Sequence, residues 1–124
     1  MPPKTILIVE DSQDLADTVH DLLVMHHYRA LVALTGKDAI ALALSEHPDL
    51  ILLDIRLPDI SGYDVLQAVR KDAWGETANV LVLTASESRE NIAKNIAISL
   101  DKILFKPDLS IPDLIAKIEA SLTQ

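Results

Sequence analysis

Five short runs of apolar residues alternate along this chain with longer segments whose apolar positions recur every three or four residues. The short runs are apolar at nearly every position, which is typical of parallel strands that are buried on both faces. They predict strands at residues 4–9, 29–34, 50–53, 80–83 and 102–105.

Each strand is followed by a segment with helical periodicity. The first helix is expected at about residues 13–26, because the hydroxyl of Ser12 can cap its start. The second follows a turn at Thr35 and runs over 37–46; it ends at His47, since the residue before a proline disfavours the helical region. Three more helices are predicted at 62–71, from Ser86 or Glu87 to about Ser99, and from Ser110 onward with Pro112 in the first turn.

A strand followed by a helix, five times over, predicts an α/β fold. We expect a doubly wound (βα)5, flavodoxin-like three-layer sandwich around a five-stranded parallel sheet. The strand order 2-1-3-4-5 is expected because it is the common order of flavodoxin-like folds in general. The 124 residues contain no linker and no repeat beyond the βα units, so residues 1–124 are expected to form a single domain.

Composition narrows the function classes. With 49% hydrophobic but only 3% aromatic residues, the core should be aliphatic. The absence of cysteine excludes disulfides and thiolate metal sites. No apolar run approaches the roughly 20 residues of a membrane span, and the N-terminus lacks a signal-peptide layout, so a cytoplasmic protein without membrane partners is expected. A net charge of −8 argues against nucleic acid as a partner.

Polar residues stand where four of the predicted strands end. They are Glu10 and Asp11, Asp54, Thr84, and Lys106. Because ligands bind at the carboxyl ends of parallel strands, these side chains are expected to share one site. A carboxylate such as Asp54 can act as a nucleophile and form an aspartyl-phosphate. Acidic oxygens suit Mg²⁺, while an ammonium and a hydroxyl can neutralise and hydrogen-bond a phosphoryl group.

Four motifs make the sequence similar to a known family. They are residues 6–11 (ILIVED), residues 52–58 (LLDIRLP) together with Gly62, residues 83–85 (LTA) and residues 106–107 (KP). In this order and at these separations they resemble the receiver domain of two-component (phosphorelay) response regulators, such as the chemotaxis receivers. The resemblance covers essentially the whole chain.

The resemblance implies a role for each site residue. Asp54 matches the phosphoacceptor, and Thr84 and Lys106 match the residues that grip the phosphoryl group. The implied Mg²⁺ site comprises Glu10, Asp11, Asp54 and the backbone carbonyl of Arg56, with Asp11 and Asp54 as the direct carboxylate ligands. The Lys106–Pro107 bond is expected to be cis, as is usual in the family.

The resemblance also implies partners. The phosphodonor would be a sensor histidine kinase or a phosphotransfer protein. The domain would catalyse only its own phosphorylation and slow dephosphorylation, and would not act as an enzyme on other substrates. Output would pass to a downstream protein through the face built by the fourth helix, fifth strand and fifth helix, and apolar positions left over on the last helix could serve a homodimer. The chain ends one helix after Lys106, so we expect a stand-alone regulator or a fragment of a longer one.

Two departures from the family pattern lie on the expected output face. Ile103 stands where the family usually has an aromatic residue, and Ser99-Leu100 replaces the usual Gly-Ala. An isoleucine cannot hydrogen-bond or sweep the volume of a ring, so a weaker or different coupling to output is predicted. Arg56 and Ser86, two residues past Asp54 and Thr84, are expected to tune the phosphate lifetime.

Two other functions are compatible with this fold. A pseudo-receiver that is not phosphorylated would act as an interaction module, and the altered position of Ile103 favours it mildly. An aspartate-nucleophile phosphatase is the other alternative. It is disfavoured because Arg56 stands where such enzymes have a second aspartate, and the glycine-rich nucleotide motifs are absent from a chain with three glycines.

Overall fold

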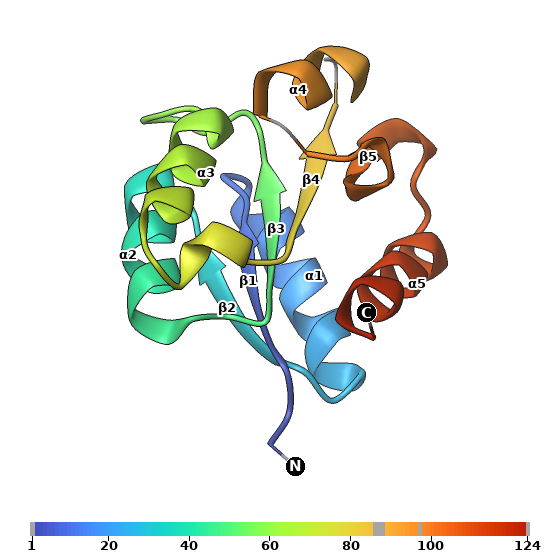
Figure 1. Cartoon of the computed structure of the whole chain (residues 1–124). Helices are drawn as coiled ribbons and strands as arrows, with labels where there is room; N and C mark the ends of the chain where they lie inside the picture. Colours follow the sequence, from blue (N-terminus) through green and yellow to red (C-terminus); the bar gives the residue numbers. More distant parts are fainter. Residues whose placement is uncertain (1, 86–88, 97, 124) are drawn as a thin grey trace.

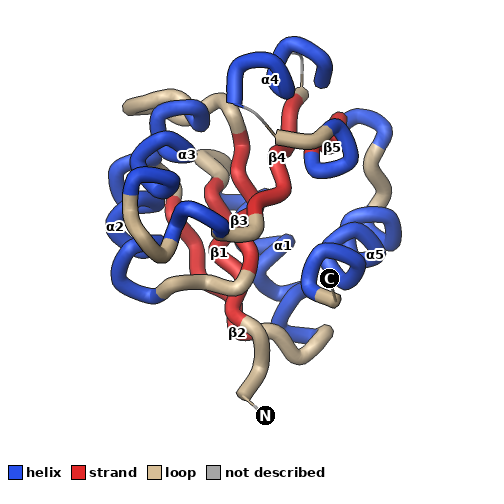
Figure 2. Tube along the Cα trace, viewed as in Figure 1, coloured by secondary structure: helices blue, strands red, loops and turns tan. Residues whose placement is uncertain are grey.

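A computed structural model of the chain describes residues 2–85, 89–96 and 98–123. Its five strands form one parallel sheet in the order β2-β1-β3-β4-β5 (Figures 1 and 2). The strands are β1 (Thr5–Val9), β2 (Arg29–Ala33), β3 (Leu50–Asp54), β4 (Val80–Thr84) and β5 (Ile103–Phe105). The predicted fold class and strand order are therefore confirmed.

Helices cover both faces of the sheet. They are α1 (Gln13–Met25), α2 (Gly36–Glu46), α3 (Gly62–Lys71), α4 (Arg89–Ile96) and α5 (Ile111–Leu122). In Figure 1, α2 and α3 lie on one side of the sheet and α1 and α5 on the other. Short 3-10 turns at Gly75–Thr77, Leu100–Lys102 and Lys106–Asp108 complete the described secondary structure.

The alternation of side chains along each strand divides the core in two. On β1, Leu7 and Val9 join the core under α2 and α3, whereas Ile6 and Ile8 join the core under α1 and α5. Successive residues of a strand point to opposite faces, so a continuously apolar strand supplies both cores at once. This is why the strands lack the polar face of a half-exposed sheet.

Hydroxyl side chains start four of the five helices. Ser12, Thr35, Ser61 and Ser110 each accept a hydrogen bond from a backbone N–H in the first turn of the helix that follows. Ser61 and Ser110 form reciprocal capping boxes with Asp64 and Asp113. At the other end of α2, His47 adopts the left-handed region with a φ of 47°, which stops the helix before Pro48 as the sequence predicts.

Three details differ from the sequence-based expectations or lie beyond the described residues. No cis peptide bond occurs among the described residues, so the expectation for Lys106–Pro107 is wrong. Trans is the intrinsically favoured isomer even before proline, and here it leads into the 3-10 turn in which the N–H of Leu109 donates to the Lys106 carbonyl at 3.1 Å. Strand β5 begins at Ile103 because Lys102 belongs to the preceding 3-10 turn. The predicted starts of α4 at Ser86 or Glu87 fall outside the described residues.

Candidate functional site

The ends of β1 and β3 bring three carboxylates together. Val9 pairs with Leu53 in the sheet, so the residues that follow them, Glu10 and Asp54, emerge side by side. One oxygen from each of Glu10, Asp11 and Asp54 lies within 4.8 Å of the others. Glu10 and Asp54 are only 5% and 6% exposed, whereas Asp11 is exposed. The strand ends therefore form the acidic cluster that the sequence predicts.

Lys106 holds the two buried carboxylates. Its Nζ donates to Glu10 Oε1 and to Asp54 Oδ2, both at 2.7 Å. With all four groups ionised, three carboxylates face one ammonium, so the cluster carries an excess of two negative charges. Such an excess attracts a divalent cation.

Backbone N–H groups hold the second oxygen of each buried carboxylate. The N–H of Arg56 donates to Asp54 Oδ1 at 3.0 Å, and the N–H of Ser12 donates to Glu10 Oε2 at 3.1 Å. Each carboxylate is thus fixed between the Lys106 ammonium and a backbone donor. Their orientation is set before any ligand arrives, which is the preorganisation that charge-stabilising sites require.

The pKa values of Glu10 and Lys106 reflect the burial and the close approach of these charged groups. Burial raises the pKa of Glu10 above its usual value, and the hydrogen bonds from Lys106 and Ser12 offset this only in part. Burial alone would lower the pKa of Lys106, but its hydrogen bonds to Asp54 and Glu10 outweigh that effect and raise it. Both shifts mean that the cluster favours added positive charge.

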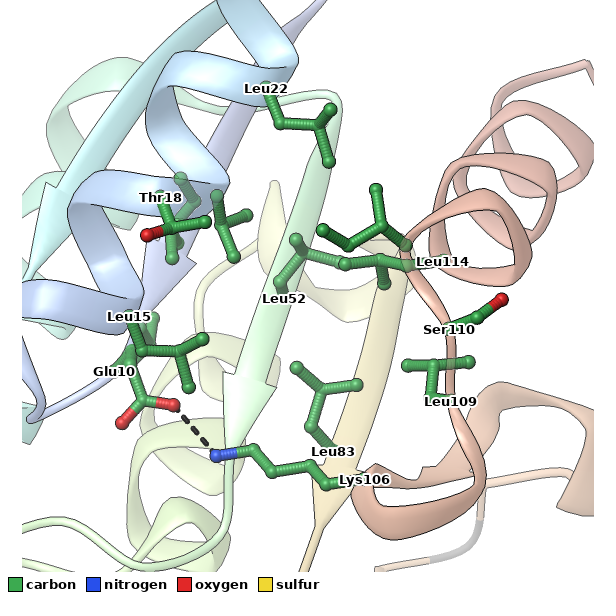
Figure 3. Close-up of a pocket in the computed structure, with 14 residues that line it drawn as sticks. Glu10, Leu15, Thr18, Leu22, Leu52, Leu83, Lys106, Leu109, Ser110 and Leu114 are labelled. Atoms are coloured by element: carbon green, nitrogen blue, oxygen red, sulfur yellow. Dashed lines mark hydrogen bonds and ion pairs between the residues drawn. The ribbon is translucent and has the colours of Figure 1, made fainter.

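An apolar cavity of about 230 Å³ adjoins the ion pair (Figure 3). Figure 3 shows the Glu10–Lys106 pair at one end of this cavity, with leucines of α1, the sheet and the approach to α5 around it. The labelled lining residues are Glu10, Leu15, Thr18, Leu22, Leu52, Leu83, Lys106, Leu109, Ser110 and Leu114. These walls give the pair an apolar flank, which explains why burial has the largest effect on the pKa of Glu10.

Thr84 and Arg56, two of the remaining predicted site residues, follow or end strands at the same edge of the sheet. Thr84 is the buried last residue of β4, one position beyond Leu83, which pairs with Asp54. Arg56 is exposed in the loop after β3. Ser86 lies outside the described residues. The expected roles of these residues stay predictions.

Ile103 occupies the core instead of the surface. Its side chain is 0% exposed, and it pairs with Val82 at the start of β5. It belongs to the hydrophobic cluster under α2 and α3, which also contains Ile92 of α4. The position at which the family usually carries a ring is thus filled here by an aliphatic core residue.

Sequence reasoning missed one residue near the site. Asp59, in the loop between β3 and α3, accepts hydrogen bonds from the backbone N–H groups of Gly36 and Lys37 at 2.8 and 3.0 Å. The only signal in the sequence is that this loop and the turn before α2 both follow strand ends at one edge of the sheet.

Comparison with known proteins agrees with this geometry. The model of the response regulator receiver domain matches residues 6–119. The chain belongs to the response regulator receiver domain family. Receiver domains are signalling switches, and the cluster of Glu10, Asp11 and Asp54 is consistent with the Mg²⁺ and phosphorylation site of such domains.

Two curated relatives belong to longer proteins. The receiver is 35% identical over 120 residues to the probable transcriptional regulatory protein TcrX of Mycobacterium tuberculosis, covering 97% of this chain and 50% of the relative. It is 32% identical over 122 residues to the phosphate regulon transcriptional regulatory protein PhoB of Pseudomonas aeruginosa, covering 98% and 53%. The chain therefore spans about half the length of these relatives.

A solved structure has the same fold. The chemotaxis protein CheY4 of Vibrio cholerae superposes with a TM-score of 0.85 at 24% identity, covering 97% of this chain and 99% of that one. Among the described residues of the receiver, no helix is long and apolar enough to span a membrane.

Proposed function

We propose that Asp54 is the phosphoacceptor of this receiver and that Mg²⁺ is its cofactor. The observation that carries the proposal is the position of the Asp54 carboxylate. It is buried at the sheet edge, 2.7 Å from the Lys106 ammonium and clustered with Glu10 and Asp11. A nucleophilic carboxylate, a cation and an acidic metal site are the parts that phosphoryl transfer to an aspartate requires.

In the proposed reaction, an oxygen of Asp54 attacks the phosphorus of a phosphohistidine. The new P–O bond gives an acyl phosphate, while the P–N bond breaks and its electron pair stays on the imidazole, which takes up a proton. Lys106, already hydrogen-bonded to Asp54 Oδ2, neutralises the incoming phosphoryl oxygens. The hydroxyl of Thr84 is proposed to donate a hydrogen bond to one of them.

The donor set suits Mg²⁺. Carboxylates and backbone carbonyls are the oxygen ligands that this ion prefers, and Asp11, Asp54 and the Arg56 carbonyl are proposed to hold it directly. Glu10, which completes the acidic cluster, is proposed to contact the ion through water. When bound, Mg²⁺ supplies the positive charge that screens the carboxylates from the incoming phosphoryl group.

The partners follow from this chemistry. We infer that a histidine kinase or a phosphotransfer protein supplies the phosphoryl group, and that the product state changes binding to a downstream protein at the face formed by α4, β5 and α5. The names of the relatives describe transcriptional regulators, and this chain spans about half of each. Their output activities therefore extend to this receiver only as a proposal.

Intact mass tests the proposal. The native chain and Asp54→Asn are incubated with Mg²⁺ and a small acyl phosphate donor. We expect one phosphate on the native chain and none on the variant. EDTA added before the donor should prevent phosphorylation of the native chain. Phosphate on both proteins, or uptake that is indifferent to EDTA, would contradict the assignment.

An interaction module that works without phosphorylation is the second candidate. The burial of Ile103 in the core favours it, because no ring is present there to change position with phosphorylation. When a downstream partner has been identified, equal affinity of that partner for the phosphorylated and unphosphorylated chains would support this candidate. A large gain on phosphorylation would remove it.

A further inference from the structure

The loop from Ile55 to Ser61 is closed at its base beside the phosphoacceptor. The N–H of Gly62 donates to the Ile55 carbonyl at 2.8 Å. Within the loop, the N–H of Arg56 donates to Asp54 Oδ1 at 3.0 Å. The orientation of Asp54 therefore depends on where the backbone of Arg56 lies.

The tip of this loop is hydrogen-bonded to the start of α2. Asp59 accepts hydrogen bonds from Gly36 and Lys37, which lie 23 and 22 residues away in sequence, through separate carboxylate oxygens at 2.8 and 3.0 Å. These N–H groups open α2 and have no partner within their own helix. The hydrogen bond from Gly36 is the main reason that the pKa of Asp59 falls to about 2. The Asp59 carboxylate is therefore charged throughout the physiological pH range, so it keeps both hydrogen bonds.

A second contact holds the same tip. Ile60 packs against the core under α2 and α3, and it lies so close to Gly36 that any Cβ there would collide with its side chain. The start of α2 and the tip of the loop are therefore joined by two hydrogen bonds and by an apolar contact. The loop is held at its base and at its tip, with Arg56 between them.

We propose that Asp59 is a positioning residue for the acidic site, because it docks the loop after β3 on the start of α2 and so fixes the backbone of Arg56. The proposal rests on the function proposed above, in which the Arg56 carbonyl is a ligand of Mg²⁺. Asp59 touches neither the metal nor the phosphoryl group; it acts through the loop.

A helix cap alone would be a simpler role, but α2 already has one. Thr35 caps the same helix and accepts from the N–H of Asp38 at 3.1 Å. Thr35 is not part of the loop after β3. Thr35→Ala therefore weakens the start of α2 without releasing the loop, which makes it the matched control for Asp59→Ala.

Three measurements separate the two roles. Calorimetry gives the Mg²⁺ affinity, phosphoryl uptake against Mg²⁺ concentration gives the half-saturating concentration and the maximal rate, and amide exchange by NMR reports on the Arg56 N–H without metal. Urea unfolding shows that each variant is folded. We expect Asp59→Ala to weaken Mg²⁺ affinity about 10-fold, as removal of supporting groups around metal ligands does. The half-saturating concentration should rise more than the maximal rate falls, and the Arg56 amide should exchange faster.

Thr35→Ala should leave all three readouts at native values, and Asp59→Asn, which keeps one acceptor oxygen, should be intermediate. If Asp59→Ala and Thr35→Ala match in Mg²⁺ affinity and in Arg56 exchange while the native chain binds Mg²⁺, the positioning role is overturned and the proposed function stands. A native chain that neither binds Mg²⁺ nor takes up phosphate would overturn both.

Discussion

Gly62→Ala tests most directly how much stability depends on the close packing of the backbone beside Asp54. Gly62 begins α3, and no described glycine has a positive φ, so its backbone conformation is open to alanine. The restriction is space. A Cβ at this position would lie 2.6 Å from the Asp54 carbonyl oxygen and 2.8 Å from the Ile55 Cα.

The magnitude follows from two opposing effects. Replacing glycine by alanine in a compatible backbone conformation restricts the unfolded chain and stabilises the fold by about 0.4–1 kcal/mol. Against this, ordinary contact begins near 3.4 Å, so the backbone of Asp54 must retreat by about 0.8 Å from its present 2.6 Å. Overpacking of this kind costs about 1–3 kcal/mol. Because both colliding atoms belong to the backbone and cannot rotate away, we expect the clash to win and the variant to lose about 1–2 kcal/mol of stability.

Urea unfolding measures the stability, and phosphoryl uptake from a small donor measures the effect on the site. Uptake should slow, because the displaced backbone carries the Asp54 carboxylate out of its hydrogen bonds with Arg56 and Lys106. Ser61→Ala is the control: it removes the cap of α3 at a cost of about 1 kcal/mol without adding atoms near Asp54. A Gly62→Ala protein that is at least as stable as the native chain and takes up phosphate at the native rate would refute the reasoning.

Three further predictions concern the buried charges, pH and the core position of Ile103. Lys106→Met leaves the buried carboxylates of Glu10 and Asp54 without their ammonium, so the free energy of unfolding in urea without Mg²⁺ should fall by about 3 kcal/mol. Added Mg²⁺ should recover part of this loss, and equal stability of the variant and the native chain would contradict the prediction. The lowered pKa of Asp59, about 2, means that its stabilising effect is complete above about pH 5, where the unfolded chain is also ionised, and is lost as the pH falls through about 2. The stability difference between the native chain and Asp59→Asn should therefore shrink as the pH falls from about 5 to 2, and a constant difference would count against the hydrogen bonds between Asp59 and α2. Ile103→Ala should cost about 3 kcal/mol because the side chain is fully buried, and a loss below about 1 kcal/mol would show that its surroundings collapse to fill the space.

Much of the fold could be predicted because local and global signals agree. Strand β3 is apolar from Leu50 to Leu53 and buried along its whole length, which indicates a sheet covered on both faces. Ser12 and Ser110 mark helix starts by the capping chemistry of their side chains. The site was predictable for a related reason: parallel strands end at one edge, so Glu10 and Asp54 come together although 44 positions separate them in sequence.

The rest depends on contacts that leave no periodic signal. The hydrogen bond from Gly36 to Asp59 forms only because the loop after β3 and the start of α2 meet in space. The need for glycine at position 62 comes from a nearby backbone and not from a turn conformation. The cis isomer expected at Pro107 rests on the family pattern alone, and nothing in the local residues distinguishes cis from trans strongly enough to decide it.

The central claim is that Asp54 carries the phosphoryl group, and chemical mapping tests it most directly. Borohydride reduces an acyl phosphate to an alcohol, so it converts a phosphorylated aspartate to homoserine, which peptide mass mapping then locates. After treatment with Mg²⁺ and a small acyl phosphate donor, we expect homoserine at position 54 and at no other aspartate. Homoserine at Asp11 or elsewhere, or none on a chain that binds Mg²⁺, would contradict the claim.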